Sequence, residues 1–223
     1  MRSCWRSHPN GRACNIRARA CHHRTVPGRK GLFLDRDGVI NLERGYVSSR
    51  DEFHFQEGIF ELCRVAQSLG YLLLVVTNQA GIARGYYTES DFLTLTEWMV
   101  ERFAEQQIRI ARVYYCPFHP EGIGEYRRDS EDRKPRPGML LRARDEFELD
   151  LGASLLIGDR PSDIDAAESA GVGTRILLET ESTEGYVPEG RYYRWRSLAG
   201  IQRRFFPPAS EAESPRLLVD RNP

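Results

Sequence analysis

The chain has little cysteine and no long apolar run. Its five cysteines among 223 residues are Cys4, Cys14, Cys21, Cys63 and Cys116, an odd number without paired spacing. This pattern argues against a disulfide framework and favours a reducing compartment, so we expect a cytoplasmic protein. No apolar stretch approaches the roughly 18 residues that a membrane-spanning helix needs, so we expect no membrane association.

Acidic residues are missing from the first 30 positions, which carry eight Lys and Arg. The remaining residues have a net charge of −8, so the formal charge of zero combines a basic leader with a mildly acidic body. The leader lacks the apolar core of a secretory signal, and its Cys and His residues match no standard zinc finger. We expect residues 1–30 to be a disordered extension, with a nucleic-acid-binding arm as the alternative. Residues 31–206 form the predicted domain, and residues 207–223 a flexible tail.

Apolar strands alternate with amphipathic helices along the body of the chain. We expect strands at 32–34, 71–76, 112–115, 155–157 and 174–178, and helices at 58–69, 88–106, 139–147 and 163–170. Residues 179–206 are expected to add one irregular strand and a short helix. This alternation predicts an α/β fold, a Rossmann-like and mainly parallel sheet with helices on both faces. The intervals between strands are too short for a separate cap domain, so loops 41–57 and 117–137 should frame the site.

Two carboxylates follow the first predicted strand. Asp35 and Asp37 come directly after the apolar residues 32–34, and Gly38 allows the chain to turn. A buried strand of a parallel sheet ends at the edge where open α/β folds bind their ligands. Two carboxylates at that edge are placed to hold a hard cation and attack an electrophile. The alternative is an Asp-rich turn without chemistry.

Three later segments carry groups that match this chemistry. Thr77 directly follows the apolar part of the second strand, and N–H groups of the next turn could hold an anion. Asp159 follows the fourth strand, where it could bind a cation, whereas we interpret Asp163 as a helix N-cap or a supporting group. Arg133 and Lys134 precede two prolines that stiffen their loop. Each segment alone could be an ordinary loop, but their order and shared position at strand ends make a strong joint signal.

An Asp pair, a Thr, a Lys and a further Asp in this order resemble the four motifs of the haloacid dehalogenase (HAD) superfamily, over about residues 31–178. Longer strings are similar to one family within it, the D-glycero-D-manno-heptose-1,7-bisphosphate 7-phosphatases. These strings are Leu34-Asp35-Arg36-Asp37-Gly38-Val39-Ile40-Asn41, Arg44-Gly45-Tyr46-Val47, Thr77-Asn78-Gln79-Ala80-Gly81-Ile82-Ala83-Arg84-Gly85, Tyr114-Tyr115-Cys116-Pro117, His119-Pro120-Glu121-Gly122 and Arg133-Lys134-Pro135. The resemblance implies a HAD-like hydrolase that removes the 7-phosphate of a heptose bisphosphate, in carbohydrate metabolism that leads to lipopolysaccharide.

The resemblance also implies a mechanism through an aspartyl-phosphate. Asp35 would be the nucleophile, and Asp37 the general acid and then the general base. Mg²⁺ would be held by Asp35, Asp159 and the backbone carbonyl of Asp37. Thr77 and Lys134 would hold the other phosphoryl oxygens. The positions similar to the family's substrate contacts are Glu43, Arg44, Gly45, Tyr46, Asn78, Gln79, Ala80, Arg133 and Arg160.

One pattern of the family is broken in this chain. Members often carry a structural zinc bound by Cys-Pro-His-His-Pro and a later Cys-x-Cys-Arg-Lys-Pro. Here Phe118 stands at the usual histidine, and Ser130 and Asp132 replace both later cysteines. Because tetrahedral structural zinc is bound by thiolate and imidazole ligands, we predict that structural zinc is absent. A mixed site from Cys116, His119 and Asp132 is the alternative.

Three other functions stay open on sequence alone. The first is a histidinol-phosphate phosphatase, which shares the same four motifs. The second is a nucleic-acid 3′-phosphatase, which would give the basic leader a role. The third is a binding protein that keeps the fold without catalysis. Every motif position holds a chemically competent residue, which favours an enzyme. We expect a small sugar phosphate as the partner, no membrane or nucleic acid, and a monomer.

Overall fold

The computed structural model describes residues 28–179, 185–187 and 191–207. The predicted extension at 1–30 and the predicted tail at 207–223 therefore lie almost entirely outside the described residues. Arg29 forms a β-bridge with Leu149, so backbone pairing begins slightly before the predicted domain boundary at residue 31.

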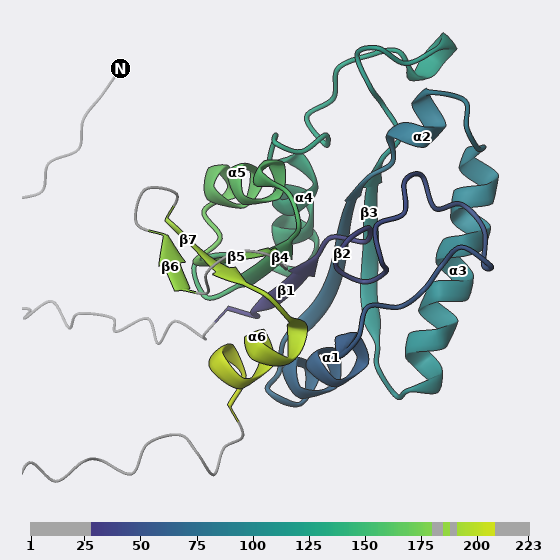
Figure 1. Ribbon diagram of the computed structural model, residues 1–223. Helices are drawn as coiled ribbons and strands as arrows, with labels where there is room; N and C mark the ends of the chain where they lie inside the picture. The colour runs from purple at the N-terminus through teal and green to yellow at the C-terminus, as the bar shows by residue number, and fades with distance from the viewer. Residues whose placement is uncertain (1–27, 180–184, 188–190, 208–223) are drawn as a thin grey trace, which may run out of the picture.

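A seven-stranded sheet forms the centre of the described chain (Figure 1). In spatial order its strands are β3 (Ile110–Cys116), β2 (Leu72–Asn78), β1 (Gly31–Leu34), β4 (Leu155–Gly158), β5 (Thr174–Leu178), β7 (Tyr192–Trp195) and β6 (Gly185–Val187). All neighbouring strands are parallel except β6 and β7, which are antiparallel. The predicted α/β fold is confirmed, and the five strands predicted from apolar runs are the first five in this order.

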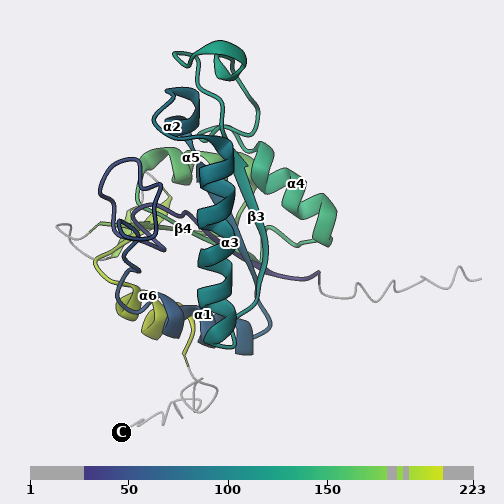
Figure 2. The ribbon, with the colours of Figure 1, turned by 90° about the vertical axis from the view of Figure 1, so that its right-hand side faces the viewer.

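Helices cover both faces of the sheet (Figures 1 and 2). The helices are α1 (Ile59–Ser68), α2 (Ala80–Ala83), α3 (Glu89–Glu105), α4 (Gly138–Phe147), α5 (Pro161–Ala170) and α6 (Leu198–Phe205), with a 3₁₀ turn η1 at Gly124–Tyr126. Side chains alternate along β1, so Leu32 and Leu34 pack with α1, α3 and α6, whereas Phe33 packs with α4 and α5. Within the described residues no segment forms a separate cap domain, as predicted.

Local sequence explains where two of these helices begin. Thr88 caps α3 as predicted: its Oγ1 accepts the Asp91 N–H at 3.1 Å, and the Asp91 carboxylate accepts the Thr88 N–H at 2.9 Å. Helix α5 begins at Pro161, two residues earlier than predicted, because proline suits the first helical position with its fixed φ and missing N–H. The N-cap is therefore Arg160 and not Asp163; Asp163 is the third residue of the helix, and its side chain accepts the N–H of Arg160 at 3.0 Å.

The C-terminal part departs from prediction. Residues 179–206 were expected to give one irregular strand, but two short strands, β6 and β7, pair here before α6. The equally short β1 and β4 were predicted from their apolar runs, whereas β6 has only three residues and β7 contains the charged Arg194, so neither shows such a run. Among the described residues, no helix has the length and apolar character needed to cross a bilayer.

Candidate active site

The carboxyl ends of β1, β2 and β4 meet at one edge of the sheet. The parallel register pairs Leu34, the last residue of β1, with Val75 and with Ile157, and beyond this point β2 continues to Asn78 and β4 to Gly158. Asp35 is the first residue after β1, and its N–H donates to the Ile157 carbonyl at 3.0 Å. Asp159 is the first residue after β4. The register therefore brings carboxylates more than 120 positions apart in the chain to the same edge, as the sequence predicts.

Lys134 reaches this edge from the loop that precedes α4. Its Nζ donates to the Val76 carbonyl at 2.8 Å and lies 3.0 Å from Oδ1 of Asp35 and 2.5 Å from Oδ1 of Asp163. The side chain amide of Asn78 fixes the Lys134 backbone by two hydrogen bonds, one to its carbonyl at 3.0 Å and one from its N–H at 3.1 Å. Because Lys134 and Asp163 are 4% and 1% exposed, this ammonium is isolated from bulk water.

Asp37 is held by a separate set of donors. Nη2 of the buried Arg36 donates to both carboxylate oxygens at 2.8 Å, and Asn41 Nδ2 donates to Oδ1 at 3.1 Å. Gln79 Nε2 donates to Asp37 Oδ2 at 3.2 Å and to Thr77 Oγ1 at 2.8 Å. These contacts fix the orientation of the Asp37 carboxylate relative to Thr77 without using the groups that hold Asp35.

Tyr87 completes the network behind Asp37. Its hydroxyl donates to Gln79 Oε1 at 2.6 Å, which orients the amide so that its nitrogen faces Thr77 and Asp37. Burial raises the pKa of Tyr87 to about 12, so the hydroxyl keeps its proton for this bond at neutral pH. A Cβ at Gly81 would lie 2.2 Å from the Tyr87 ring, so glycine is required there for the ring to pack.

Three carboxylates could together hold a cation. Oxygen atoms of Asp35, Asp159 and Asp163 lie within 4.8 Å of one another, and Oδ1 of Asp159 is buried without a hydrogen-bond partner among the described residues. A Cβ at Gly38 (φ 83°) would lie 2.2 Å from Asp159, so that glycine leaves room for the carboxylate. An oxygen-only donor set fits Mg²⁺. Both oxygens of Asp163 already face Lys134 or the Arg160 N–H, which makes Asp35 and Asp159 the better ligands.

The electrostatics of this cluster favour a cation. Burial raises the pKa of Asp35 to about 8, an effect that Lys134 opposes and Asp163 reinforces. Burial and Asp163 likewise raise the pKa of Asp159 to about 6. Burial opposes the charge of Lys134, but Asp163 and Asp35 raise its pKa above the usual range. One ammonium thus faces three carboxylates, an excess of negative charge that a divalent cation relieves.

A cavity of about 550 Å³ opens over these groups. It is lined by Asp35, Asp37, Glu43, Gly45, Tyr46, Asn78, Ala80, Gly81, Arg84, Tyr87, His119, Arg133, Lys134, Pro135, Arg160, Ser162 and Asp163. Ten of the predicted site residues are in this set. Of the others, Thr77 and Gln79 are buried and connect to Asp37, Asp159 belongs to the carboxylate cluster, and Arg44 is exposed outside the lining.

Loop 41–57 contributes a strained turn to the cavity wall. Gly45 has φ 74° and Tyr46 has φ 31°, so two successive residues adopt left-handed conformations. Such a conformation is unfavourable for a tyrosine and persists only where other contacts impose it. The Tyr46 hydroxyl accepts from Arg84 at 2.6 Å, and its ring meets that of Tyr86 edge-on at 4.5 Å. At the same wall Arg160 pairs with Glu43 at 3.1 Å.

Seven residues of the cavity lining were not among the predicted site residues: Gly81, Arg84, Tyr87, His119, Pro135, Ser162 and Asp163. Asp163 was interpreted as a helix cap or supporting group, but it also pairs with Lys134. Arg84 and Tyr87 lie in or just after a quoted motif, and no spacing rule distinguishes a lining side chain from an exposed one. His119 was considered only as a zinc ligand, but it lines the cavity.

The positions of the broken zinc pattern are occupied by other contacts. Cys116 Sγ lies 3.8 Å from the Phe118 carbonyl, and Asp132 pairs with Arg142 at 2.7 Å. Within the described part of the chain, the ligand atoms that gather closely enough for a metal are those of the carboxylate cluster, and Cys116, His119 and Asp132 do not form such a group.

Known proteins resemble the chain in sequence and in fold. A HAD-hydrolase-like family model matches residues 132–187. The chain is 58% identical over 150 residues to the D-glycero-alpha-D-manno-heptose-1,7-bisphosphate 7-phosphatase of Burkholderia mallei, covering 67% of this chain and 79% of that protein. It is 50% identical over 153 residues to the D-glycero-beta-D-manno-heptose-1,7-bisphosphate 7-phosphatase of Vibrio cholerae, covering 68% and 82%.

Two solved structures share the fold. A HAD-like phosphatase from Mesorhizobium loti superposes with a TM-score of 0.71 at 33% identity, covering 78% of this chain and 85% of that one. The D,D-heptose 1,7-bisphosphate phosphatase of B. bronchiseptica, solved with magnesium and phosphate, has a TM-score of 0.66 at 26% identity, covering 77% and 95%.

The parallel sheet, the strand-end carboxylates and the buried lysine define a phosphatase of the HAD superfamily, a phosphoric monoester hydrolase. At 58% identity over most of the relative's length, the chain belongs to the D-glycero-D-manno-heptose-1,7-bisphosphate 7-phosphatase family.

Proposed function

We propose that this enzyme removes the 7-phosphate of D-glycero-D-manno-heptose 1,7-bisphosphate in a Mg²⁺-dependent reaction. The supporting observation is that the chain is 58% identical to such a phosphatase and carries a cavity whose base joins Asp35, Lys134 and Asp163. The relatives named above act on either the alpha or the beta bisphosphate, so both anomers are candidate substrates.

Asp35 is the proposed nucleophile. Its Oδ1 accepts from Lys134 at 3.0 Å and from the Arg36 N–H at 2.8 Å, so Oδ2 is the oxygen left to attack phosphorus. The bond from phosphorus to the sugar oxygen breaks as the bond to Asp35 forms. Lys134 and the Thr77 hydroxyl would hold the remaining phosphoryl oxygens as charge moves onto the leaving group.

Asp37 is the proposed acid and base. It would give a proton to the leaving sugar alkoxide, and then take a proton from the water that attacks the aspartyl-phosphate and releases Asp35. The contacts from Arg36, Asn41 and Gln79 support this role because they hold the carboxylate beside Asp35 in one orientation.

Asp35, Asp159 and the Asp37 backbone carbonyl are the proposed magnesium ligands. When bound, the ion neutralises the repulsion between the anionic nucleophile and the anionic substrate. The buried, unpartnered Oδ1 of Asp159 supports this assignment. Glu43, Gly45, Tyr46, Asn78, Ala80, Arg133 and Arg160 line the cavity and are the proposed substrate contacts; Arg44 and Gln79 are proposed on the resemblance alone.

Release of phosphate from a substrate panel tests this function. The panel holds both heptose bisphosphate anomers, histidinol phosphate and a 3′-phosphorylated oligonucleotide, each with and without Mg²⁺. We expect turnover of a heptose bisphosphate only with Mg²⁺. Asp35→Asn should lower kcat by about 10⁴-fold or more, whereas Asp165→Asn, at an exposed position on α5, should leave kcat unchanged. Faster turnover of histidinol phosphate would contradict the proposed substrate.

We also propose that the protein folds without a structural zinc, is a monomer and is located in the cytoplasm. The loop at 117–137 carries Arg128 at 3.7 Å over the Phe118 ring and the Asp132–Arg142 pair, contacts that support folding without a structural zinc. Metal analysis of the purified protein that finds one zinc per chain would contradict this. Free, buried Cys63 and Cys116 support a cytoplasmic location, and gel filtration tests the proposed monomer.

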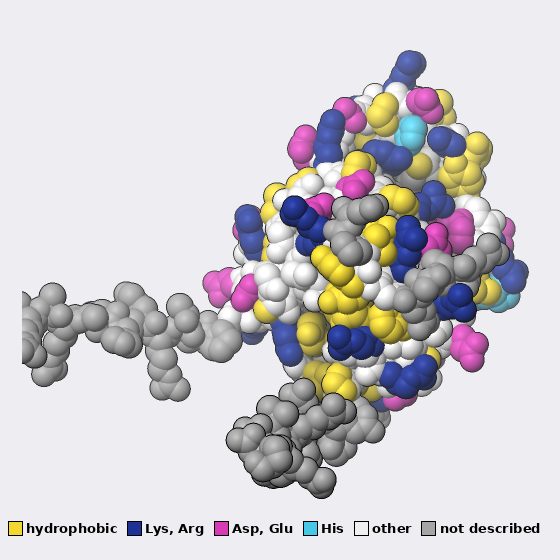
Figure 3. Space-filling view, turned by 60° about the vertical axis from the view of Figure 1, so that its left-hand side comes forward, with side chains coloured by type: hydrophobic (Ala, Val, Ile, Leu, Met, Phe, Trp, Pro, Cys, Tyr) yellow, Lys and Arg dark blue, Asp and Glu magenta, His cyan; other side chains and the backbone are white. Residues whose placement is uncertain are grey.

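Binding to nucleic acid is not part of the proposal. On the face shown in Figure 3, basic side chains of the described residues lie scattered among acidic and apolar ones. Binding to nucleic acid usually depends on basic residues that gather on one face. The oligonucleotide in the panel tests this point directly.

A further inference from the structure

The cavity contains a second group of charges that the reacting phosphate does not require. Arg84, Arg133 and His119 all line it, from the end of α2 and from the loop at 117–137. We call these three residues the basic group. Neither the carboxylate cluster nor the Asp37 network forms hydrogen bonds or ion pairs with them among the described residues, and the mechanism above assigns no step to Arg84 or His119.

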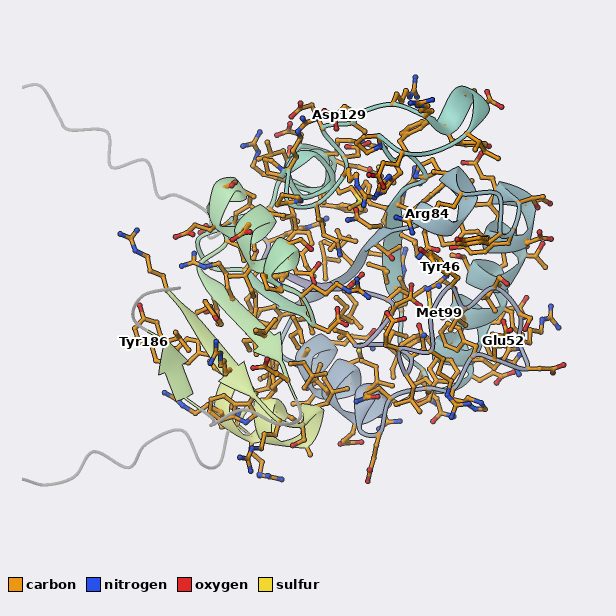
Figure 4. The ribbon with its side chains drawn as sticks, turned by 45° about the horizontal axis from the view of Figure 1, so that its top comes forward. Tyr46, Glu52, Arg84, Met99, Asp129 and Tyr186 are labelled. Carbon is orange, nitrogen blue, oxygen red and sulfur yellow. The ribbon has the colours of Figure 1, made fainter. Side chains whose placement is uncertain are left out.

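Arg84 is positioned by the strained turn of loop 41–57. Its Nη1 donates to the Tyr46 hydroxyl at 2.6 Å, and its guanidinium carbon lies 5.9 Å from the centre of the Tyr46 ring. Figure 4 shows Tyr46 and Arg84 lying close together between α2 and this loop. The hydroxyl bond occupies one nitrogen of the guanidinium, so donors of the other nitrogens are left for a ligand in the cavity.

Arg133 and His119 offer further donors to the same space. Arg133 Nη1 donates to the Phe118 carbonyl at 3.3 Å, and Arg133 forms no ion pair among the described residues. The Nδ1 of His119 accepts the Glu121 N–H at 3.0 Å. The imidazole proton therefore lies on Nε2, where it can be donated to a ligand.

The charges of the basic group repel one another. Burial lowers the pKa of Arg133, and nearby Arg84 lowers it further. Burial also lowers the pKa of His119, with Arg133 and Arg84 as additional causes. Arg84 pairs with Glu121 at 3.9 Å, but the Glu121 side chain is 80% exposed, so it compensates little.

The other two cations of the cavity have carboxylate partners. Lys134 contacts Asp35 and Asp163, and Arg160 pairs with Glu43 at 3.1 Å. Like charges held together without close acidic partners are favourable only when an anion binds between them. Guanidinium groups suit phosphate in particular, because they donate two parallel hydrogen bonds to its oxygens.

We propose that Arg84 and His119, together with Arg133, bind the second, non-reacting phosphate of the substrate and select bisphosphates over monophosphates. This inference rests on the proposed function and adds the residues that recognise the distal end of the sugar. Arg84 is the residue on which the selection depends most, because its Tyr46 contact gives the guanidinium a defined orientation.

Kinetics on a matched pair of substrates test the inference. The full chain with Mg²⁺ is assayed on heptose 1,7-bisphosphate, in both anomers, and on heptose 7-phosphate, which lacks the distal phosphate. Arg84→Gln should lower kcat/KM for the bisphosphate by about 10- to 100-fold, the effect of losing a charged hydrogen bond. Its kcat/KM for the monophosphate should stay near the wild-type value, because the lost contact is absent there. Arg84→Lys, which keeps the charge but not the planar donor pair, should lie between.

A control variant separates recognition from a general loss of charge. Arg127→Gln changes an exposed arginine of the loop at 117–137 that does not line the cavity. This variant should behave as wild type on both substrates. Equal losses for Arg84→Gln on the two substrates, or no loss on either, would overturn the inference while leaving the proposed function intact.

The proposed function is contradicted by the wild-type assay alone if the wild-type enzyme hydrolyses neither heptose bisphosphate anomer. In that case fructose 1,6-bisphosphate and fructose 6-phosphate provide the same comparison. An Arg84-dependent preference for the bisphosphate supports the inference, and no preference overturns it.

Discussion

The two charged regions of the cavity are built differently. Asp35, Asp163 and Lys134 are buried at the carboxyl edge of the sheet, and each contacts another member of the set. Arg84, Arg133 and His119 are partly exposed, come from loops or a helix end, and have no close acidic partner. In the proposed mechanism these buried residues carry the reaction common to a superfamily, whereas the basic group is proposed to face the part of the substrate that differs between enzymes.

This contrast predicts that changes in the buried region affect catalysis and folding, whereas changes in the loops affect selectivity.

Asp37→Asn should have the largest effect after the loss of the nucleophile. The carboxylate can no longer transfer a proton, so kcat for the sugar phosphate should fall by about 10²- to 10⁴-fold. The loss should be much smaller for p-nitrophenyl phosphate, whose leaving group needs no proton. Equal losses on the two substrates would indicate that Asp37 acts by holding Arg36 and Gln79 rather than by proton transfer.

Lys134→Met tests the buried cluster as a structural unit. Removing the ammonium leaves Asp35 and Asp163 buried without their shared partner, which should lower the free energy of unfolding by about 3–5 kcal/mol. Urea denaturation at neutral pH without Mg²⁺ measures this loss. Adding Asp163→Asn to the variant removes one of the orphaned charges and should restore part of the stability. A loss of about 1 kcal/mol or less, as for an exposed pair, would break the contrast between the two regions.

The pH dependence of stability gives a third test. The pKa of Asp35 is about 8 in the folded protein and 3.8 for an ordinary aspartate, so the folded chain binds its proton more tightly. Without Mg²⁺, the contribution of Asp35 to stability is therefore complete at low pH and is lost as the pH rises from about 4 to about 8. Asp35→Asn should flatten this decline in urea titrations at several pH values. The exposed control Asp165→Asn should retain it, and an unchanged decline in Asp35→Asn would assign the effect to other groups.

The sequence predicted the buried cluster better than the basic group, and for a physical reason. Asp35 and Asp159 directly follow β1 and β4, and Thr77 lies near the carboxyl end of β2. Because parallel strands end at one edge, the meeting of these residues could be inferred from their order alone. The pairing of Asp163 with Lys134 depends on how α5 and the preceding loop pack, which no local pattern encodes.

The basic group depends on tertiary contacts throughout. Arg84 is oriented by Tyr46, which is 38 positions away in the chain. Tyr46 adopts a left-handed backbone conformation that the propensities of tyrosine do not predict. Strands β1 to β5 were predicted because each contains an apolar run. Strands β6 and β7 were assigned as one, because neither contains such a run.

The smallest expected effect belongs to the loop that carries Arg133. Arg142 pairs with Asp132 at 2.7 Å, but their side chains are 56% and 27% exposed, so water and salt screen the pair. Arg142→Gln should lower the free energy of unfolding by about 0.2–1 kcal/mol at low salt, and by less at high salt. Its kcat/KM ratio for bisphosphate over monophosphate should stay at the wild-type value, because Arg142 does not line the cavity. A change in that ratio would mean that the loop's exposed ion pairs position Arg133, and that selectivity depends on the whole loop rather than on the three residues of the basic group.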